Sequence, residues 1–108
     1  MVHKFGIIGS GSWATALVKI LTDNKLPVNW WMRNTDSINY IRQKKNNHHY
    51  LSTVYFDTSL LTLSDNIREV VASSDTLVMA VPSAYIENVL KPLQVSDFAG
   101  KKILSSIK

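Results

Sequence analysis

The chain has 108 residues, no cysteine, and a formal net charge of +4 from 12 Lys and Arg against 8 Asp and Glu. Its content of 45% hydrophobic and 19% charged residues is that of a globular domain, which excludes a disordered chain. The lack of cysteine excludes disulfides, thiolate metal sites and a cysteine nucleophile, and it makes the cytoplasm the expected location. No stretch approaches the roughly 18 apolar residues that a membrane span needs, so none is expected.

A short apolar strand, a glycine-spaced turn and an amphipathic helix open the chain and are its most informative feature. We expect the strand over residues 4–8 and the helix over 12–23. Gly9 permits the tight turn, Gly11 leaves room for a pyrophosphate, and Ala14 lets the helix lie close to the strand. N–H groups at the helix start, with the positive end of its dipole behind them, would then face the phosphates. The predicted phosphate contacts are Gly9, Ser10, Gly11, Ser12 and Trp13.

Strands and helices alternate along the rest of the chain. Asn24 is the expected left-handed end of the first helix, and Thr35 or Asp36 the expected cap of the second. A strand over 28–32 and a helix with Ile38 and Ile41 inward are expected next, followed by an irregular stretch over 46–60. A strand near 61–63 then leads to a helix entered at Asn66, with Glu69 at the capping-box spacing. The last expected elements are a strand over 76–81, a helix from Pro82-Ser83 with Ile86, Val89, Leu90 and Leu93 on its apolar side, and a strand over 102–107.

This order predicts the α/β class, with a Rossmann-type parallel sheet and flanking helices. Strands that alternate with helices are joined by right-handed crossovers, and both faces of the resulting sheet must be covered. The sequence stops at about the fifth strand, with nothing after it to cover that flank. We therefore expect residues 1–108 to be an incomplete N-terminal dinucleotide-binding domain of a larger enzyme.

The residue after the second strand bears on the choice of cofactor. NAD sites usually have an acid there, about 20 residues after the first glycine, which bonds the ribose 2′-hydroxyl. Here Arg33 stands 24 residues after Gly9, and the first acid is Asp36. A guanidinium can pair with a 2′-phosphate and stack on adenine. The sequence predicts NADP preference or use of both cofactors; the alternative is an exposed arginine bonded to strand-end carbonyls.

Three further candidates each have a structural alternative. Trp13 either packs on the sheet or forms an aromatic wall beside the diphosphate. Ser12 can cap the helix, bond phosphate, or do both. Pro82 lies with Ser83 at the carboxyl end of the fourth strand, where open parallel sheets place their ligands, although it can also simply end the strand.

The remaining polar features lead to two negative expectations. The neighbours His48 and His49 diverge on any regular element and have no evident third ligand, so no metal is expected. The basic residues at 42–45 suit a solvated helix end, where cations complement the dipole. No recognition motif accompanies them, so no nucleic-acid partner is expected. Lys108, at the carboxyl edge of the last strand, could hold a phosphate or carbonyl oxygen, or be frayed as a terminal residue.

Five spaced motifs together resemble the NAD(P)-dependent glycerol-3-phosphate dehydrogenase family. The resemblance covers essentially the whole chain. One departure is Ala14, where the family usually has glycine, although alanine meets the same packing need. The motifs are Gly9-Ser10-Gly11-Ser12-Trp13-Ala14-Thr15-Ala16-Leu17, Trp31-Met32-Arg33-Asn34, Asn47-His48-His49-Tyr50-Leu51, Ala80-Val81-Pro82-Ser83 and Ser105-Ser106-Ile107-Lys108.

The resemblance implies hydride transfer between NAD(P)H and dihydroxyacetone phosphate, giving sn-glycerol 3-phosphate for phospholipid synthesis. It also implies a C-terminal helical substrate domain that this chain lacks, with the general-acid lysine in the missing part, and a homodimer for the full-length enzyme. The roles carried over by position are Ser12 and Trp13 at the diphosphate, Arg33 at the adenosine ribose or its phosphate, Tyr50 on the adenosine side, and Lys108 at both cofactor and substrate. Asn34 and Pro82 are also expected to bind the cofactor.

Two other functions are compatible with parts of this sequence. One is another two-domain NADP reductase, of the ketopantoate or 6-phosphogluconate type, with the same first half. Trp13 and the motif at residues 47–51 favour the glycerol-phosphate family over it. The other is a nucleotide-sensing module without catalysis, which requires that the natural chain end near residue 108.

Overall fold

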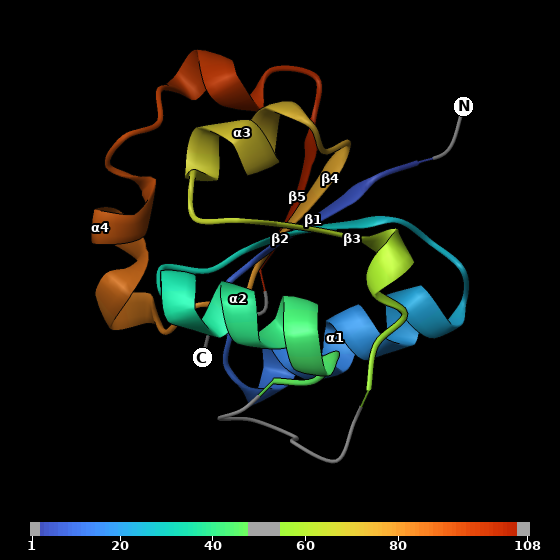
Figure 1. Cartoon of the computed structure of the whole chain (residues 1–108). Coiled ribbons are helices and arrows are strands. Elements are labelled where there is room, and N and C mark those ends of the chain that lie inside the picture. Colours follow the sequence, from blue (N-terminus) through green and yellow to red (C-terminus); the bar gives the residue numbers. More distant parts are fainter. Residues whose placement is uncertain (1–2, 48–54, 106–108) are drawn as a thin grey trace.

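The computed structural model describes residues 3–47 and 55–105, and it places their strands in one parallel sheet (Figure 1). The strands are β1 (Phe5–Ile8), β2 (Val28–Trp31), β3 (Leu61–Ser64), β4 (Thr76–Met79) and β5 (Lys102–Ser105). The α-helices are α1 (Ser12–Asp23), α2 (Thr35–Lys44), α3 (Ile67–Ala72) and α4 (Ile86–Leu90), with 3₁₀ turns at Thr58–Leu60, Ser83–Tyr85 and Val95–Phe98. The strand order β3-β2-β1-β4-β5 confirms the predicted Rossmann-type sheet.

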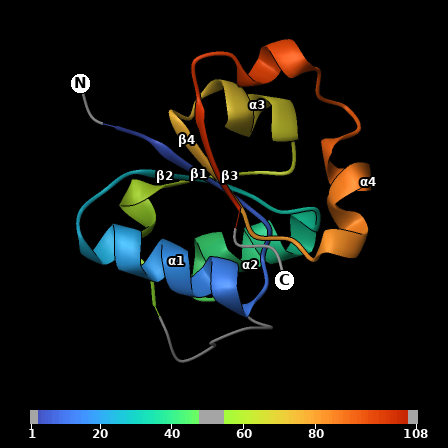
Figure 2. The same cartoon turned by 180° about the vertical axis from the view of Figure 1, so that it is seen from behind.

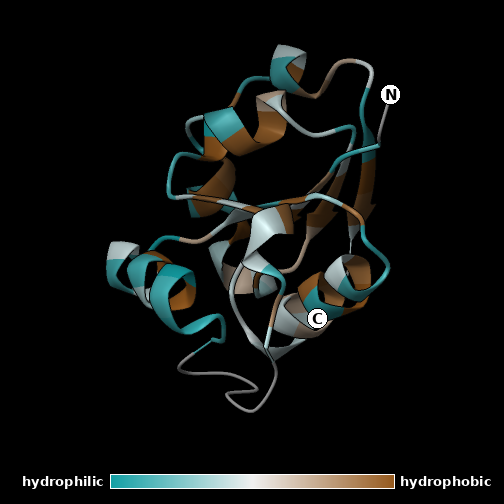
Figure 3. Ribbon diagram, turned by 45° about the vertical axis from the view of Figure 1, so that its right-hand side comes forward, coloured by the Kyte–Doolittle hydropathy of each residue, from teal (hydrophilic) through white to brown (hydrophobic). Residues whose placement is uncertain are grey.

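Two apolar layers lie on opposite faces of the sheet. Helices α1 and α2 cover one face, while α3 and α4 lie on the other (Figures 1 and 2). The tryptophans of β2 illustrate the alternation, because Trp30 packs in the first layer with Ile7 and Trp31 in the second with Ile8. The apolar sides of the helices turn towards the sheet and their hydrophilic sides outwards (Figure 3). The two adjacent tryptophans thus contribute one side chain to each layer.

Helix α1 spans Ser12–Asp23 as predicted, with Asn24 as its C-cap, but two details of its ends differ from the prediction. Its N-cap is Gly11, and no side chain caps it, so Ser12 is not the cap. At the other end the left-handed residue is Lys25, with a φ of 61°, and not Asn24. Asn24 instead donates its side-chain amide to the carbonyl of Ile20 at 2.7 Å. The predicted Ala14 contact is confirmed, since Ala14 is fully buried against the sheet.

Helix α2 is capped by Asn34, and neither Thr35 nor Asp36 has that role. The Asn34 side-chain oxygen accepts from the backbone N–H of Asp36 at 2.8 Å and of Ser37 at 3.4 Å. The prediction missed this because Asn34 was assigned to the ligand site. The inward positions of α2, Ile38 and Ile41, are confirmed as buried.

The second half of the chain is less regular than predicted. Strand β4 ends at Met79, two residues earlier than predicted, although the Ala80 N–H still donates to the Ile8 carbonyl of β1 at 2.9 Å before the chain turns. The predicted helix from Pro82 is a 3₁₀ turn followed by the short α4, and Leu93 lies beyond its end. The stretch expected to be irregular contains the 3₁₀ turn Thr58–Leu60 and a bridge between Asn46 and Tyr55. Asn66 does cap α3 as predicted.

No helix in the described ranges 3–47 and 55–105 is long and apolar enough to cross a membrane.

At the amino edge of the sheet, β1 and the start of β4 are in close contact. A Cβ built on Gly6 would overlap the Ser74 hydroxyl and lie 2.8 Å from a methyl group of Leu77. Ser74 has no freedom to retreat, because its hydroxyl donates to the Val70 carbonyl at 2.6 Å and accepts from Asn29 at 3.1 Å. The side chains of Ser74 and Leu77 therefore leave no room for a side chain at Gly6.

We expect Gly6→Ala to lower the free energy of unfolding by about 1–3 kcal/mol, the usual cost of overpacking a dense interior. Urea unfolding followed by circular dichroism measures the change. An unfolding midpoint equal to that of the parent chain would contradict the close contact around Ser74.

Candidate functional site

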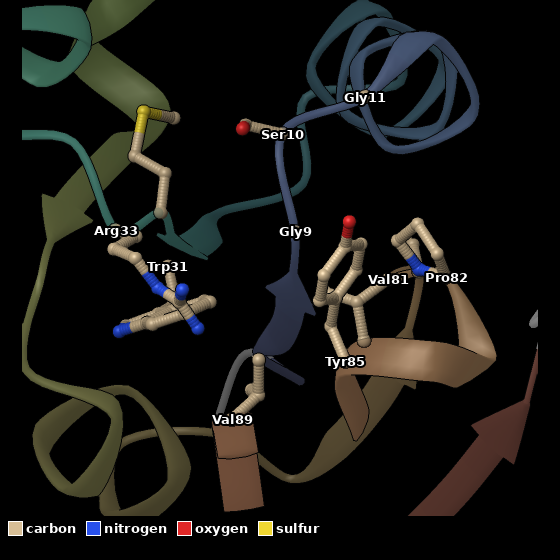
Figure 4. A pocket seen from close by; sticks show the side chains of 11 residues that line it. Gly9, Ser10, Gly11, Trp31, Arg33, Val81, Pro82, Tyr85 and Val89 are labelled. Atoms are coloured by element: carbon tan, nitrogen blue, oxygen red, sulfur yellow. The ribbon is translucent and has the colours of Figure 1, made fainter. Parts of the chain in front are cut away.

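A cavity of about 290 Å³ lies at the carboxyl edge of the sheet, where β1, β2 and β4 end (Figure 4). Its floor is the turn after β1, and its two sides come from the segments after β2 and β4. The lining residues are Gly9, Ser10, Gly11, Trp31, Met32, Arg33, Ala80, Val81, Pro82, Tyr85 and Val89. This is the edge at which open parallel sheets bind their ligands.

Gly9 fixes where the backbone turns away from the sheet. Its φ of +125° is a conformation that residues with a side chain rarely adopt, and an added Cβ would lie 2.5 Å from the Ala80 carbonyl oxygen. The Gly9 N–H donates to the carbonyl of Trp31 at 3.1 Å, which continues the pairing of β1 with β2. The turn is thus wedged between the ends of both neighbouring strands.

The next three residues present backbone N–H groups without protein partners. In the part of the chain that the structure describes, no hydrogen bond is formed by the amide N–H of Ser10, Gly11 or Ser12. The first turn of α1 follows directly, so the positive end of a 12-residue helix stands behind them. No atom lies within 4 Å of a Cβ built on Gly11, which leaves open space over the turn. Such a group of donors suits an anion such as a diphosphate.

Arg33 is the one charged side chain among the described residues that line the cavity. It is exposed, and within those residues its guanidinium donates no hydrogen bond, so the alternative of an arginine bonded to strand-end carbonyls is not realised. Arg42, which is exposed in the last turn of α2 as predicted, makes such a bond instead, to the Leu63 carbonyl at 3.0 Å. One cation and no described carboxylate on the lining favour an anionic ligand.

The structure brings Gly9, Ser10, Gly11, Arg33 and Pro82 of the predicted site residues to one cavity. Ser12 and Asn34 flank it as the first residue of α1 and the cap of α2. Trp13 is 51% exposed, so its interpretation as a core residue is wrong. Tyr50, Lys108 and the pair His48-His49 lie outside the described residues.

The sequence analysis missed the apolar sides of the cavity. Trp31 and Tyr85 lie on opposite sides of the turn in Figure 4, with Val81 beside Tyr85 and Val89 of α4 between the two aromatic side chains. Trp31 was named only within a motif, and Tyr85 was not singled out. The signal available was the position of Tyr85 shortly after Pro82, at the carboxyl end of a buried strand. Within ranges 3–47 and 55–105 no group of three metal-ligating side chains occurs.

Sheet order, turn geometry and unpartnered amides together define a dinucleotide-binding domain of the Rossmann type. A family model described as NAD-dependent glycerol-3-phosphate dehydrogenase N-terminus matches residues 4–108, and the chain belongs to this family. The chain is 37% identical over 101 residues to a glycerol-3-phosphate dehydrogenase [NAD(P)+] of Bacillus subtilis, and 35% over 90 residues to that of Bacillus pumilus. These matches cover 94% and 83% of the chain but only 28% and 26% of the relatives.

Solved structures agree with this assignment. The glycerol-3-phosphate dehydrogenase of Coxiella burnetii superposes with a TM-score of 0.84 at 25% identity, over 99% of this chain and 33% of that one. The enzyme from Plasmodium falciparum gives 0.81 at 27% identity, over 96% of this chain and 32% of that one. An imine reductase of Myxococcus stipitatus in complex with NADP+ gives 0.70 at 18% identity, over 96% of this chain and 32% of that one, which shows a shared fold.

The two glycines of the turn should respond differently to alanine. We expect Gly9→Ala to destabilise the fold, because its φ and the Ala80 carbonyl both oppose a side chain. Gly11→Ala should keep the free energy of unfolding within about 1 kcal/mol, since the added methyl meets no protein atom.

For ligand binding we expect Gly11→Ala to have a clear effect, although it has little effect on stability. Gly11→Ala places its methyl where an anion would approach the amides, so the dissociation constant for NADPH should rise although the fold is kept. Unfolding curves and cofactor titrations of the two variants measure both effects. Unchanged NADPH affinity in Gly11→Ala would place the ligand away from the turn.

Proposed function

We propose that this chain is the cofactor-binding part of an NAD(P)-dependent glycerol-3-phosphate dehydrogenase. The reaction would transfer a hydride between NAD(P)H and dihydroxyacetone phosphate or sn-glycerol 3-phosphate, in the cytoplasm and for phospholipid synthesis. The observation that carries the proposal is the set of amides at Ser10, Gly11 and Ser12, which have no partner among the described residues and stand at the turn that lines a cavity beside Arg33. Family membership supports the choice of substrate.

The residues of this chain would bind and orient the cofactor. The amides of the turn suit its diphosphate, and Arg33 suits the adenosine ribose or a 2′-phosphate on it. Trp31, Val81 and Tyr85 would exclude water along the sides. The nicotinamide supplies the hydride chemistry when it is bound, while the protein contributes orientation and electrostatics.

Four further residues belong to the proposal on the basis of the family motifs alone. Trp13, half exposed at the start of α1, would contact the diphosphate from outside the described cavity, and Asn34 the adenosine side. Tyr50 would lie at the adenosine and Lys108 at both cofactor and substrate. Substitution of each in turn, with NADPH titration, tests these assignments.

The chain spans between a quarter and a third of the length of the relatives it matches. Activity, substrate and a homodimeric assembly are therefore proposals about the whole protein. Family membership favours this function over a ketopantoate or 6-phosphogluconate type of reductase. A non-catalytic nucleotide-sensing module shares the same cavity and differs in lacking turnover.

We expect Arg33→Ala to weaken NADPH binding by about 1–3 kcal/mol, the scale of a lost charge-assisted contact. NADH binding should be nearly unchanged, because NADH has no 2′-phosphate. Titration calorimetry with both cofactors measures the difference.

Lys44→Ala is the matched control for that experiment. It removes the same charge from an exposed position at the end of α2, outside the cavity lining. Equal losses for NADPH and NADH in Arg33→Ala would mean that the guanidinium stacks on adenine without contacting the 2′-phosphate. A similar loss of NADPH affinity in Lys44→Ala would mean that the effect of Arg33→Ala comes from the overall charge of the chain.

The 108-residue chain by itself should bind the nucleotide weakly and not turn over. In the family, the general-acid lysine and the ligands of the substrate phosphate belong to the part of the enzyme that follows the segment matched by this chain. Absorbance at the nicotinamide band, with NADPH and dihydroxyacetone phosphate, measures turnover. Sustained oxidation of NADPH would refute this division, and a longer protein from the same reading frame that shows no turnover would favour the sensing module.

A further inference from the structure

Three consecutive carbonyl groups of the turn are each held by a hydrogen-bond donor on the side of α1 and β2. The Gly9 carbonyl accepts from the indole N–H of Trp30 at 2.6 Å. The Ser10 carbonyl accepts from the side-chain amide of Asn47 at 3.1 Å. The Gly11 carbonyl accepts from both the hydroxyl and the backbone N–H of Thr15, at 2.7 and 2.9 Å. The donors come from β2, α1 and the segment after α2.

The direction of the bonds around Asn47 follows from the chemistry of the groups. A carbonyl oxygen can only accept, so the nitrogen of the Asn47 side chain must face Ser10. The same nitrogen lies 3.0 Å from the Thr15 hydroxyl oxygen. The single hydroxyl proton of Thr15 goes to Gly11, so Thr15 accepts from Asn47. Asn47 is 3% exposed and Thr15 is fully buried, which protects this chain of bonds from water.

Pinned carbonyls determine the direction of the amides that follow them. A peptide group is planar and trans, so its N–H points away from its C=O. The side chains that donate to the carbonyls of Gly9, Ser10 and Gly11 therefore also fix the direction of the next N–H groups. These are the N–H groups of Ser10, Gly11 and Ser12, which have no protein partner in the described part of the chain. Without these donors, each peptide group could rotate and present its carbonyl oxygen to an anion.

We infer that Asn47 is a positioning residue for anion binding, which keeps the Ser10–Gly11 and Gly11–Ser12 peptide groups turned with their N–H outward. It acts on the first group directly and on the second through the Thr15 hydroxyl. The inference rests on the proposed function, because it concerns the diphosphate end of the same cavity. Asn47 itself is not among the residues that line the cavity.

The chain contains a closely matched control for Asn47. Asn29 is also buried, and its side-chain amide donates to the Ser73 carbonyl at 2.9 Å and to the Ser74 hydroxyl at 3.1 Å. That hydroxyl in turn donates to a backbone carbonyl, as Thr15 does. The Asn29 network lies near the start of β4, away from the cavity. Asn29→Asp and Asn47→Asp thus cause the same chemical disruption at two different places.

The test measures the binding of inorganic pyrophosphate and NADPH to the 108-residue chain and to both variants, together with their unfolding curves. We expect both variants to be destabilised. Only Asn47→Asp should raise the dissociation constants for the two ligands, by about tenfold or more, as expected when donors to an anion are misdirected. Asn29→Asp should remain within about twofold of the parent. In the parent and in Asn29→Asp, pyrophosphate should shift the backbone amide resonances of Ser10, Gly11 and Ser12, and these shifts should be lost in Asn47→Asp.

Each outcome decides a different question. If the parent chain binds neither ligand, the proposed function of the cavity fails. If the parent binds and folded Asn47→Asp binds equally well, or if both variants lose affinity alike, the positioning role is wrong and Asn47 is structural only.

A second pair of variants decides the matter if Asn47→Asp does not fold. Thr15→Ser keeps the hydroxyl that links Asn47 to Gly11, whereas Thr15→Val has a similar shape without it. We expect Thr15→Val to bind pyrophosphate about fivefold or more weakly than Thr15→Ser, as follows from the loss of one buried hydrogen bond. Equal affinities in these two variants would overturn the inference.

Discussion

The backbone between β1 and α1 must turn within three residues while the ends of β2 and β4 stand on either side of it. Gly9 meets this constraint, since its N–H bonds to Trp31 of β2, it adopts a φ of +125°, and it has no Cβ to collide with the Ala80 carbonyl. Once the turn is fixed there, the first free amides of α1 open into the space between the strand ends. Cavity, helix dipole and amide donors are thus consequences of one backbone conformation.

Polar groups around the turn are divided between two tasks. Its carbonyls are satisfied inward by Trp30, Asn47 and Thr15, all of them buried. Buried polar groups need partners, and these side chains supply them where no strand pairing is possible. The amides are left to the cavity side. The same hydrogen bonds that stabilise the fold therefore also set the polarity of the site, so stability and ligand binding should be partly coupled there.

Much of the architecture follows from the sequence because strand and helix signals agree with the burial they imply. The apolar runs at β1 and β4 and the spacing of Ile38 and Ile41 correctly predicted the sheet and the inner face of α2. Local capping was harder, since Asn34 and Gly11 became caps through backbone angles that composition does not reveal. The network around Asn47 could not be predicted, because it joins segments 32 and 37 residues apart through one amide group. The apolar side chains Trp31 and Tyr85 of the cavity were missed for a different reason, since Tyr85 follows Pro82 closely and that position could have indicated it.

Of the three glycines Gly6, Gly9 and Gly11, two are explained by the fold and one by the ligand. Gly6 and Gly9 are explained by protein atoms alone, because a Cβ on either would collide with β4 or the residues around it. Gly11 is different, since its φ is −72° and no protein atom lies within 4 Å of an added Cβ. Packing and backbone strain therefore give no reason for glycine at this position. Close approach of a ligand to the backbone does give a reason for glycine there. Gly11 is therefore the residue at which the requirements of binding are most cleanly separated from those of the fold.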